Sequence, residues 1–282
     1  MAGILSGLKG LGLGELENLN LYEEEQKELT VHNAQKQTIT KEEKDLIYDK
    51  SFCCPVCDVK FTSKVMKTGK TRSVSVDLDS RITYEGIDNN KYEVIVCPEC
   101  GYAAMISYFQ PLLNAQIKLL RDNICNKVNV TIPTGMIYEY EEVISRYQVA
   151  LACAIVKRGK DSEKAHICLD FAWLLRGYAE ELQLEDKTTT QEKVTELKKQ
   201  ELECLNKALE GFLNARQKEN LPICGMDQTT LDYELAAIAY KVGKDKIAAK
   251  LVSELLVSAT ANSRMKDKAR ELKRLILERY KK

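Results

Sequence analysis

The chain has 282 residues, with 42 basic and 42 acidic side chains, ten cysteines, two histidines and one tryptophan. This neutral balance argues against a strongly basic protein that coats nucleic acid, and 44% hydrophobic residues argue against global disorder. At about 150 residues per domain, the length suggests two domains with enough chain to bury a sizeable core. Two histidines leave little room for histidine-rich metal sites.

Residues 1–50 are expected to be an N-terminal extension of the folded body. Glycines recur from Gly3 to Gly14 and interrupt any helix, and a charged stretch follows from Glu23 to Lys50. The extension is either a tail that packs partly on the body or a docking segment. It lacks the charged start and uninterrupted apolar run of a secretory signal, and no stretch approaches the length of a membrane span. We therefore expect a cytoplasmic protein. The candidate apolar docking face consists of Ile4, Leu5, Leu8, Leu11 and Leu13.

Residues 51–109 predict a small β module. Val74, Val76 and Leu78 alternate with polar residues, which is typical of half-buried strands. The same alternation returns at 92–96. The module is therefore expected to contain several short strands.

Two Cys-Pro-x-Cys pairs, Cys54 with Cys57 and Cys97 with Cys100, are the strongest functional signal. Each pair predicts a tight turn, or knuckle, that places both sulfurs on one side and directs backbone N–H groups at them. Four soft thiolates suit a tetrahedral zinc ion, and they fill every coordination position. We therefore expect a structural zinc site rather than a zinc hydrolase. The gap at 58–96 exceeds the usual separation of about 15–20 residues, so inserted strands or a loop must lie between the knuckles.

Two alternatives concern this metal site. A four-thiolate iron site, as in rubredoxins, would imply one-electron transfer, although no redox partner domain is evident. Cys53 could replace Cys54 as a ligand, but proline should directly follow the first ligand of a knuckle. Lys60 and Lys64 are candidates to offset the formal charge that four thiolates leave around a divalent ion.

Residues 110–282 predict a helical domain of antiparallel pairs with short loops. Ala236 and Ala248 would let two helices approach closely, and Gly243 would end the first helix where a positive φ is needed. This pattern is typical of a tetratricopeptide-type hairpin, and an irregular helical bundle is the alternative. The expected fold class is α+β, mostly α, with a zinc-ribbon module beside helical hairpins.

Stacked helical hairpins form concave grooves that usually bind peptides or other proteins. We therefore expect a non-enzymatic adaptor whose partner is an unidentified protein or peptide. Trp173, Arg176 and Tyr240 are the candidate residues near the groove, although a tryptophan at such a position is more often part of the core.

No catalytic constellation is recognisable in the sequence. It lacks a Gly-rich phosphate loop, a nucleophile elbow and an H-E-x-x-H motif. His166 could act as base for Cys153 or Cys168, but nothing places them together, and a surface histidine beside core cysteines is the simpler interpretation. The remaining cysteines of the helical part are interpreted as small hydrophobic residues: Cys125, Cys204 and Cys224.

A basic stretch in the β module supports an alternative function. No acidic residue occurs from Val59 to Val76, and Phe61 lies among the cations. Such a stretch can follow a phosphate backbone, which would make the protein a nucleic-acid-binding ribbon with a helical regulatory domain. Acidic residues elsewhere in the module balance its charge, so a solvated face is the simpler interpretation. The candidate anion-binding residues are Lys60, Lys64, Lys67, Lys70 and Arg72.

Several stretches together carry a resemblance to a known family. They are Val96–Ala104, Cys54–Cys57 followed by Lys60 and Phe61, Tyr84–Ile87 with Tyr92–Val94, Ala172–Arg176, and Cys224–Asp227 before Leu235. On these motifs the chain resembles an uncharacterised bacterial family of unknown function, common in Firmicutes, that joins a zinc ribbon to tetratricopeptide-like helices. The resemblance implies cytoplasmic zinc binding through the four knuckle cysteines and supplies no activity. Departures from the family pattern at 77–82 and 88–90 leave the role of the inserted loop open.

Overall fold

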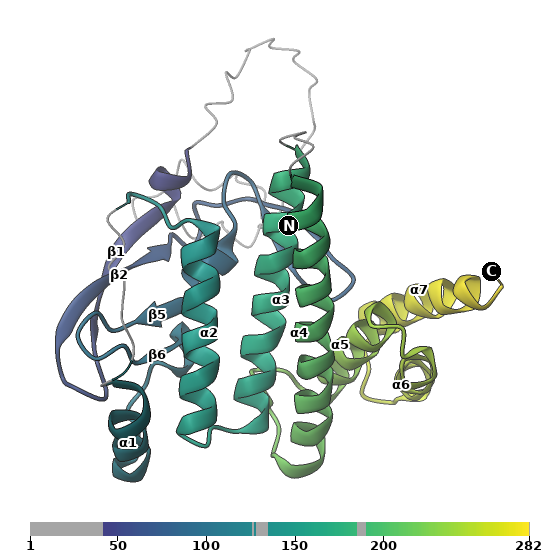
Figure 1. Ribbon diagram of the computed structural model, residues 1–282. Coiled ribbons are helices and arrows are strands. Elements are labelled where there is room, and N and C mark those ends of the chain that lie inside the picture. Colours follow the sequence, from purple (N-terminus) through teal and green to yellow (C-terminus); the bar gives the residue numbers. More distant parts are fainter. Residues whose placement is uncertain (1–41, 126, 128–134, 185–189, 282) are drawn as a thin grey trace, which may run out of the picture. The chain divides into compact units, whose positions relative to one another are not determined.

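The computed structural model describes residues 42–125, 127, 135–184 and 190–281. The predicted apolar face at 4–13 lies outside these residues. The described chain has the expected α+β fold, mostly α, in which short antiparallel strand pairs precede a series of helices (Figure 1). None of the helices described is long and apolar enough to cross a membrane.

The strands form three antiparallel pairs. The sequence predicted that the β module starts at residue 51, but β1 begins earlier. The 3-10 helix η3 (Glu43–Leu46) precedes β1. Two of the three pairs turn through a Cys-Pro-x-Cys knuckle, as the spacing predicts. The pairs are β1 (Ile47–Cys53) with β2 (Lys60–Met66), β3 (Ser73–Val76) with β4 (Ile82–Tyr84), and β5 (Val94–Val96) with β6 (Ala103–Met105).

β3 differs from the prediction of a half-buried strand. Val74 and Val76 are 66% and 57% exposed. The reason is that no further strand pairs with the β3–β4 hairpin within the described residues. The tip of this hairpin, rather than its face, contacts the helices, through Asp79 in particular.

The helical part follows the β module. Its helices are α1 (Asn114–Leu120), α2 (Tyr140–Val156), α3 (Asp161–Leu184), α4 (Thr190–Lys218), α5 (Gln228–Lys241), α6 (Asp245–Val257) and α7 (Ser263–Tyr280). A π-helical turn, Arg121–Cys125, extends α1. Figure 1 shows α2, α3 and α4 side by side. The α3–α4 contact is close because Gly211 has no side chain, and a Cβ there would lie 2.9 Å from the Cβ of Ala165.

The turn between α5 and α6 has the features that the sequence predicts. α5 ends at Lys241, and Gly243 adopts a φ of +75°. Ala236 and Ala248 are fully buried, so small side chains occupy the contact between the two helices. At the other end of α5, the Asp227 side chain accepts a hydrogen bond from the Thr230 N–H and caps the helix.

A continuous core joins the β module to α2 and α3. Val94 and Ile95 of β5 are buried there, as is Tyr147 of α2, whose hydroxyl donates to the Asn90 carbonyl at 3.0 Å. A second buried cluster, which includes Phe212, connects α3 and α4 with α5, α6 and α7. The β module is therefore packed on the helices and is not a separate appendage.

Candidate metal centre

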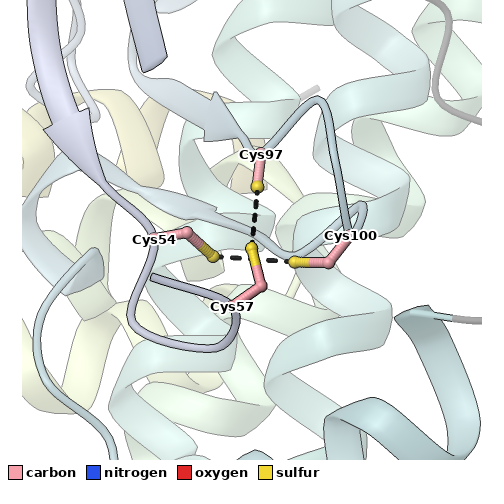
Figure 2. A group of neighbouring side chains, drawn as sticks. All are labelled: Cys54, Cys57, Cys97 and Cys100. Atoms are coloured by element: carbon pink, nitrogen blue, oxygen red, sulfur yellow. Dashed lines mark hydrogen bonds between the residues drawn. The ribbon is translucent and has the colours of Figure 1, made fainter. Parts of the chain in front are cut away.

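Four cysteine side chains meet between two hairpin turns (Figure 2). Cys54 and Cys57 come from the turn between β1 and β2, and Cys97 and Cys100 from the turn between β5 and β6. Their four Sγ atoms all lie within 4.8 Å of one another. The Cys54 and Cys100 sulfurs are 3.6 Å apart, as are those of Cys57 and Cys97. The two sequence motifs are thus brought to one point.

These distances fit a tetrahedral metal site. Sulfurs placed about 2.3 Å from a central zinc ion are about 3.8 Å apart along each edge of the tetrahedron, whereas a disulfide needs about 2.05 Å. All four cysteines are free thiols, and Cys54 and Cys97 are fully buried. The site can therefore hold a metal ion with soft ligands, and protein atoms would supply all four of them.

The two knuckles have the same backbone hydrogen bond and the same backbone conformation after the second cysteine. Asp58 N–H donates to the Cys54 carbonyl at 2.9 Å, and Gly101 N–H donates to the Cys97 carbonyl at 3.0 Å. Asp58 and Gly101, each directly after the second cysteine of its pair, adopt φ values of +62° and +72°. Glycine adopts this conformation readily and aspartate tolerates it. In the first knuckle, Val56 N–H also points at the Cys54 sulfur, at 3.4 Å.

Two of the thiols hold their protons unequally. The neighbouring thiols of Cys100 and Cys54 lower the pKa of the Cys97 thiol. The neighbouring thiols of Cys54 and Cys97 instead raise the pKa of the Cys100 thiol. Four thiolates repel one another, and a divalent cation at their centre would remove that repulsion.

The sequence interpretation missed two residues beside this cluster. Arg121, in the π-helical turn, donates to the Val56 carbonyl at 2.5 Å and so supports the first knuckle. Cys125 lies close enough to influence the cluster's Cys100, and burial raises the pKa of the Cys125 thiol. Lys64, which was expected to offset thiolate charge, lies 3.4 Å from Asp49 instead. No sequence pattern signals these contacts, because they depend on how the module packs.

A loop of the β module docks on the predicted groove residues. Asp79, at the tip of the β3–β4 hairpin, is fully buried. Its carboxylate accepts hydrogen bonds from two Arg176 nitrogens at 2.9 and 2.6 Å and from the Trp173 indole N–H at 3.2 Å. Lys241 of α5 approaches the same carboxylate at 3.1 Å. Trp173 and Arg176 therefore contact the chain's own loop, whereas the Tyr240 ring lies 3.7 Å from the Arg279 guanidinium carbon.

This docking explains the inserted residues between the knuckles. Burial alone would raise the pKa of Asp79, but the hydrogen bonds and charge of Arg176 outweigh it, so the pKa is lowered and the carboxylate stays ionised. Arg81 of the same loop makes two hydrogen bonds to Glu180, at 3.0 and 2.9 Å. Gly177 of α3 leaves space for this contact, since a Cβ there would lie 3.0 Å from Arg81 and overlap Asp88. The loop fixes the module to α3 and α5.

The basic stretch does not form one uniform cationic face. Lys64 faces Asp49, and Lys67 donates to the Asp45 carbonyl at 2.9 Å. The other three candidate cations are exposed: Lys60, Lys70 and Arg72. Nucleic-acid binding by this stretch stays a prediction.

The chain belongs to the family DUF2225, described as an uncharacterised protein conserved in bacteria, whose model matches residues 47–276. The match confirms the resemblance to an uncharacterised bacterial family. The chain is also similar to an uncharacterised protein of Borreliella burgdorferi, with 31% identity over 77 residues. That alignment covers 24% of this chain and 28% of the relative. No solved structure matches the chain.

Proposed function

We propose that this member of the bacterial family is a cytoplasmic, non-enzymatic adaptor in which one structural Zn²⁺ holds the two knuckles together. The observation that carries the zinc assignment is the set of four sulfurs within 4.8 Å of one another, with two separations of 3.6 Å that are close to the edge of a zinc–thiolate tetrahedron. Four protein ligands would leave no position for water or substrate. The ion would therefore stabilise the fold and would not activate a reactant.

The position of the cluster indicates what the metal would stabilise. The β1–β2 and β5–β6 hairpins belong to different sheets and make no strand pairing with each other. An ion bound to one knuckle from each hairpin would join them. In small zinc peptides the apparent binding energy is about 10–16 kcal/mol, and it acts as folding energy. Bound zinc would therefore fix the two hairpins of the β module relative to each other.

The adaptor surface is best assigned to α5–α7. Trp173 and Arg176 already contact Asp79, so they are engaged within the chain. Tyr240 lies at the end of α5 beside Arg279 of α7. Nearby on α7, Leu277 and Tyr280 are exposed apolar side chains of the kind that bind a protein or peptide.

Elemental analysis of the purified protein tests the zinc assignment. We expect one zinc per chain and a colourless solution. A red protein with stoichiometric iron would instead support the rubredoxin-like alternative and would contradict structural zinc.

Crosslinking and co-purification from the native cell test the adaptor assignment. We expect a protein partner that is enriched with the wild type, lost with Tyr240→Ala, and kept with Tyr48→Ala, an exposed tyrosine of β1 that serves as the matched control. Equal recovery with both variants, or no enriched protein, would contradict the adaptor. Retardation of DNA or RNA that weakens on changing Lys64 and Lys67 would favour the nucleic-acid alternative.

A further inference from the structure

A second cluster of reactive side chains lies outside the four-cysteine site. Tyr108 ends the 3-10 helix η5 (Ile106–Tyr108), His166 and Asp170 lie on α3, and Cys224 lies in the turn before α5. The Tyr108 hydroxyl is 3.0 Å from His166 Nδ1 and 3.1 Å from Cys224 Sγ. On the far side of the imidazole, His166 Nε2 is 3.6 Å from Asp170 Oδ1. Four side chains from three segments therefore form one connected series.

This arrangement adds to two sequence interpretations. Cys224 packs against the second buried cluster, as a small hydrophobic residue would, but its sulfur also contacts the Tyr108 hydroxyl and lies 3.5 Å from the Ser162 carbonyl. His166 was paired with Cys153 or Cys168 as possible nucleophiles, but the thiol that the fold brings to it is that of Cys224, through Tyr108. No sequence pattern signals this contact, because these residues lie far apart in the chain.

Asp170 supplies an independent reason to regard the cluster as functional. Its side chain is only 7% exposed, and its Oδ1 atom has no hydrogen-bond partner among the described residues. Burial raises the pKa of the Asp170 carboxyl to about 8, so its ionised form needs a positive charge beside it. The group that Oδ1 faces is the His166 imidazole. Glu93, whose pKa is raised to about 7 by burial and by Asp170, adds a second carboxyl near the same ring.

We propose that Cys224 is the nucleophilic thiol of a second site whose substrate is a small hydroperoxide. The thiol proton passes to the Tyr108 oxygen while the Tyr108 proton passes to His166 Nδ1, which leaves a thiolate and an imidazolium. Asp170 acts as a positioning residue that stabilises the imidazolium through Nε2. Paired thiolates and imidazolium ions are the usual activated form of a nucleophilic cysteine.

The same proton relay also serves the reaction of the thiolate with the hydroperoxide. The Cys224 thiolate attacks the terminal oxygen of the hydroperoxide, so that an S–O bond forms and the O–O bond breaks. Sulfur loses two electrons and the peroxide gains them. The departing oxide takes the proton that His166 holds, returned through Tyr108, and leaves as water or an alcohol. The protein product is the sulfenic acid of Cys224.

The surroundings of the sulfur favour a small substrate. Cys224 is half-buried, between the Tyr108 hydroxyl and the Ser162 carbonyl. It sits in a two-residue turn that is closed by paired hydrogen bonds between Ile223 and Met226, at 3.0 and 2.8 Å. A compact hydroperoxide can approach such a sulfur more easily than a folded polypeptide can.

The test uses the full-length, zinc-loaded protein treated with hydrogen peroxide. Sulfenic acids are trapped with a dimedone-type probe, and mass spectrometry gives the labelling rate of each cysteine. Cys53, an exposed thiol 3.5 Å from the Asp58 carbonyl, serves as the internal reference. We expect Cys224 to react about 10²-fold faster than Cys53, the lower end of what general acid–base catalysis contributes. Tyr108→Phe keeps the ring and removes the hydroxyl, and should bring Cys224 to the rate of Cys53.

The outcomes separate reactivity from a structural role. If Cys224 reacts no faster than Cys53 in the wild type, the proposal is wrong, whatever the variants do. If Tyr108→Phe melts at the wild-type temperature and Cys224 keeps its wild-type rate, the relay through Tyr108 is wrong. A purely structural cluster predicts lower thermal stability in the variant with equal labelling of both thiols. Neither result depends on which metal the four cysteines bind.

Discussion

Asp79→Asn tests whether the hairpin loop holds the β module on the helices. Asparagine has nearly the same size as aspartate, so the packing around residue 79 is kept while the charge is removed. The variant loses the charge-assisted hydrogen bonds with Arg176 and the ion pair with Lys241. Both cations then face a neutral amide in a buried site.

The cost can be worked out from the burial of the partners. The Asp79 side chain is 0% exposed and that of Arg176 is 11% exposed. Removing one partner of such a pair costs about 3–5 kcal/mol. Arg176 keeps Asp77 at 2.6 Å and Glu201 at 2.7 Å, so we expect the lower end, about 3 kcal/mol. With a urea dependence of about 3 kcal/mol per molar, the unfolding midpoint should fall by about 1 M.

The assay is urea unfolding followed by tryptophan fluorescence. Trp173 is the only tryptophan of the sequence, and its indole N–H donates to Asp79, so it reports on the docked loop. Asp77→Asn is the matched control, because that side chain is 29% exposed and should contribute no more than about 1 kcal/mol. Equal midpoints for Asp77→Asn and Asp79→Asn would refute the reasoning.

The same carboxylate predicts a pH dependence with a definite sign. The pKa of Asp79 is lowered in the folded protein below its ordinary value of 3.8, because Arg176 outweighs the effect of burial. The stability from Asp79 is therefore fully present above the unfolded pKa and is lost as the pH falls through the folded pKa. Asp79→Asn should remove this part of the acid sensitivity.

Three further predictions concern other parts of the structure. Gly177→Ala should lower the thermal midpoint, although alanine favours a helix by about 1 kcal/mol, because its Cβ would overlap Asp88; a raised midpoint would contradict that contact. Burial raises the pKa of Glu234 from 4.5 to about 8, so its contribution to the free energy of unfolding should fall as the pH rises between these values. Urea unfolding of Glu234→Gln should show a flatter pH profile, and an unchanged profile would argue that this carboxyl is ionised. Cys97→Ser should abolish stoichiometric metal binding and lower the thermal midpoint, whereas Cys53→Ser should bind metal like the wild type; the reverse would make Cys53 a ligand.

What could be predicted from the sequence is the local part of the structure. Each knuckle lies within four residues, so its spacing was enough to predict the turn. The α5–α6 turn followed in the same way from Gly243 and the small residues around it. Alternation at Val74 and Val76 predicted a strand, but alternation shows which side chains share a face and not whether another element covers that face.

The rest depends on contacts between distant parts of the chain. Asp79 and Arg176 interact although they are 97 positions apart in the chain. Tyr108 and Cys224 interact across 116 positions. Nothing in the local pattern of aspartate, arginine, cysteine or tyrosine signals such a partner. The sequence shows that residues 77–82 depart from the family pattern, but only the structure shows that this loop packs on α3.

The docked loop changes which surface of the helical hairpins can bind a partner. A ligand that used Arg176 and Trp173 would first have to displace an ionised carboxylate held by two cations. At about 3 kcal/mol, that displacement would weaken binding by about 10²-fold, since each 1.4 kcal/mol corresponds to a tenfold change in affinity. Binding around Tyr240 carries no such cost, because the cation against its ring, Arg279, belongs to an exposed helix end. A partner that binds Asp79→Asn more tightly than the wild type would show that the groove under the loop is the binding surface after all.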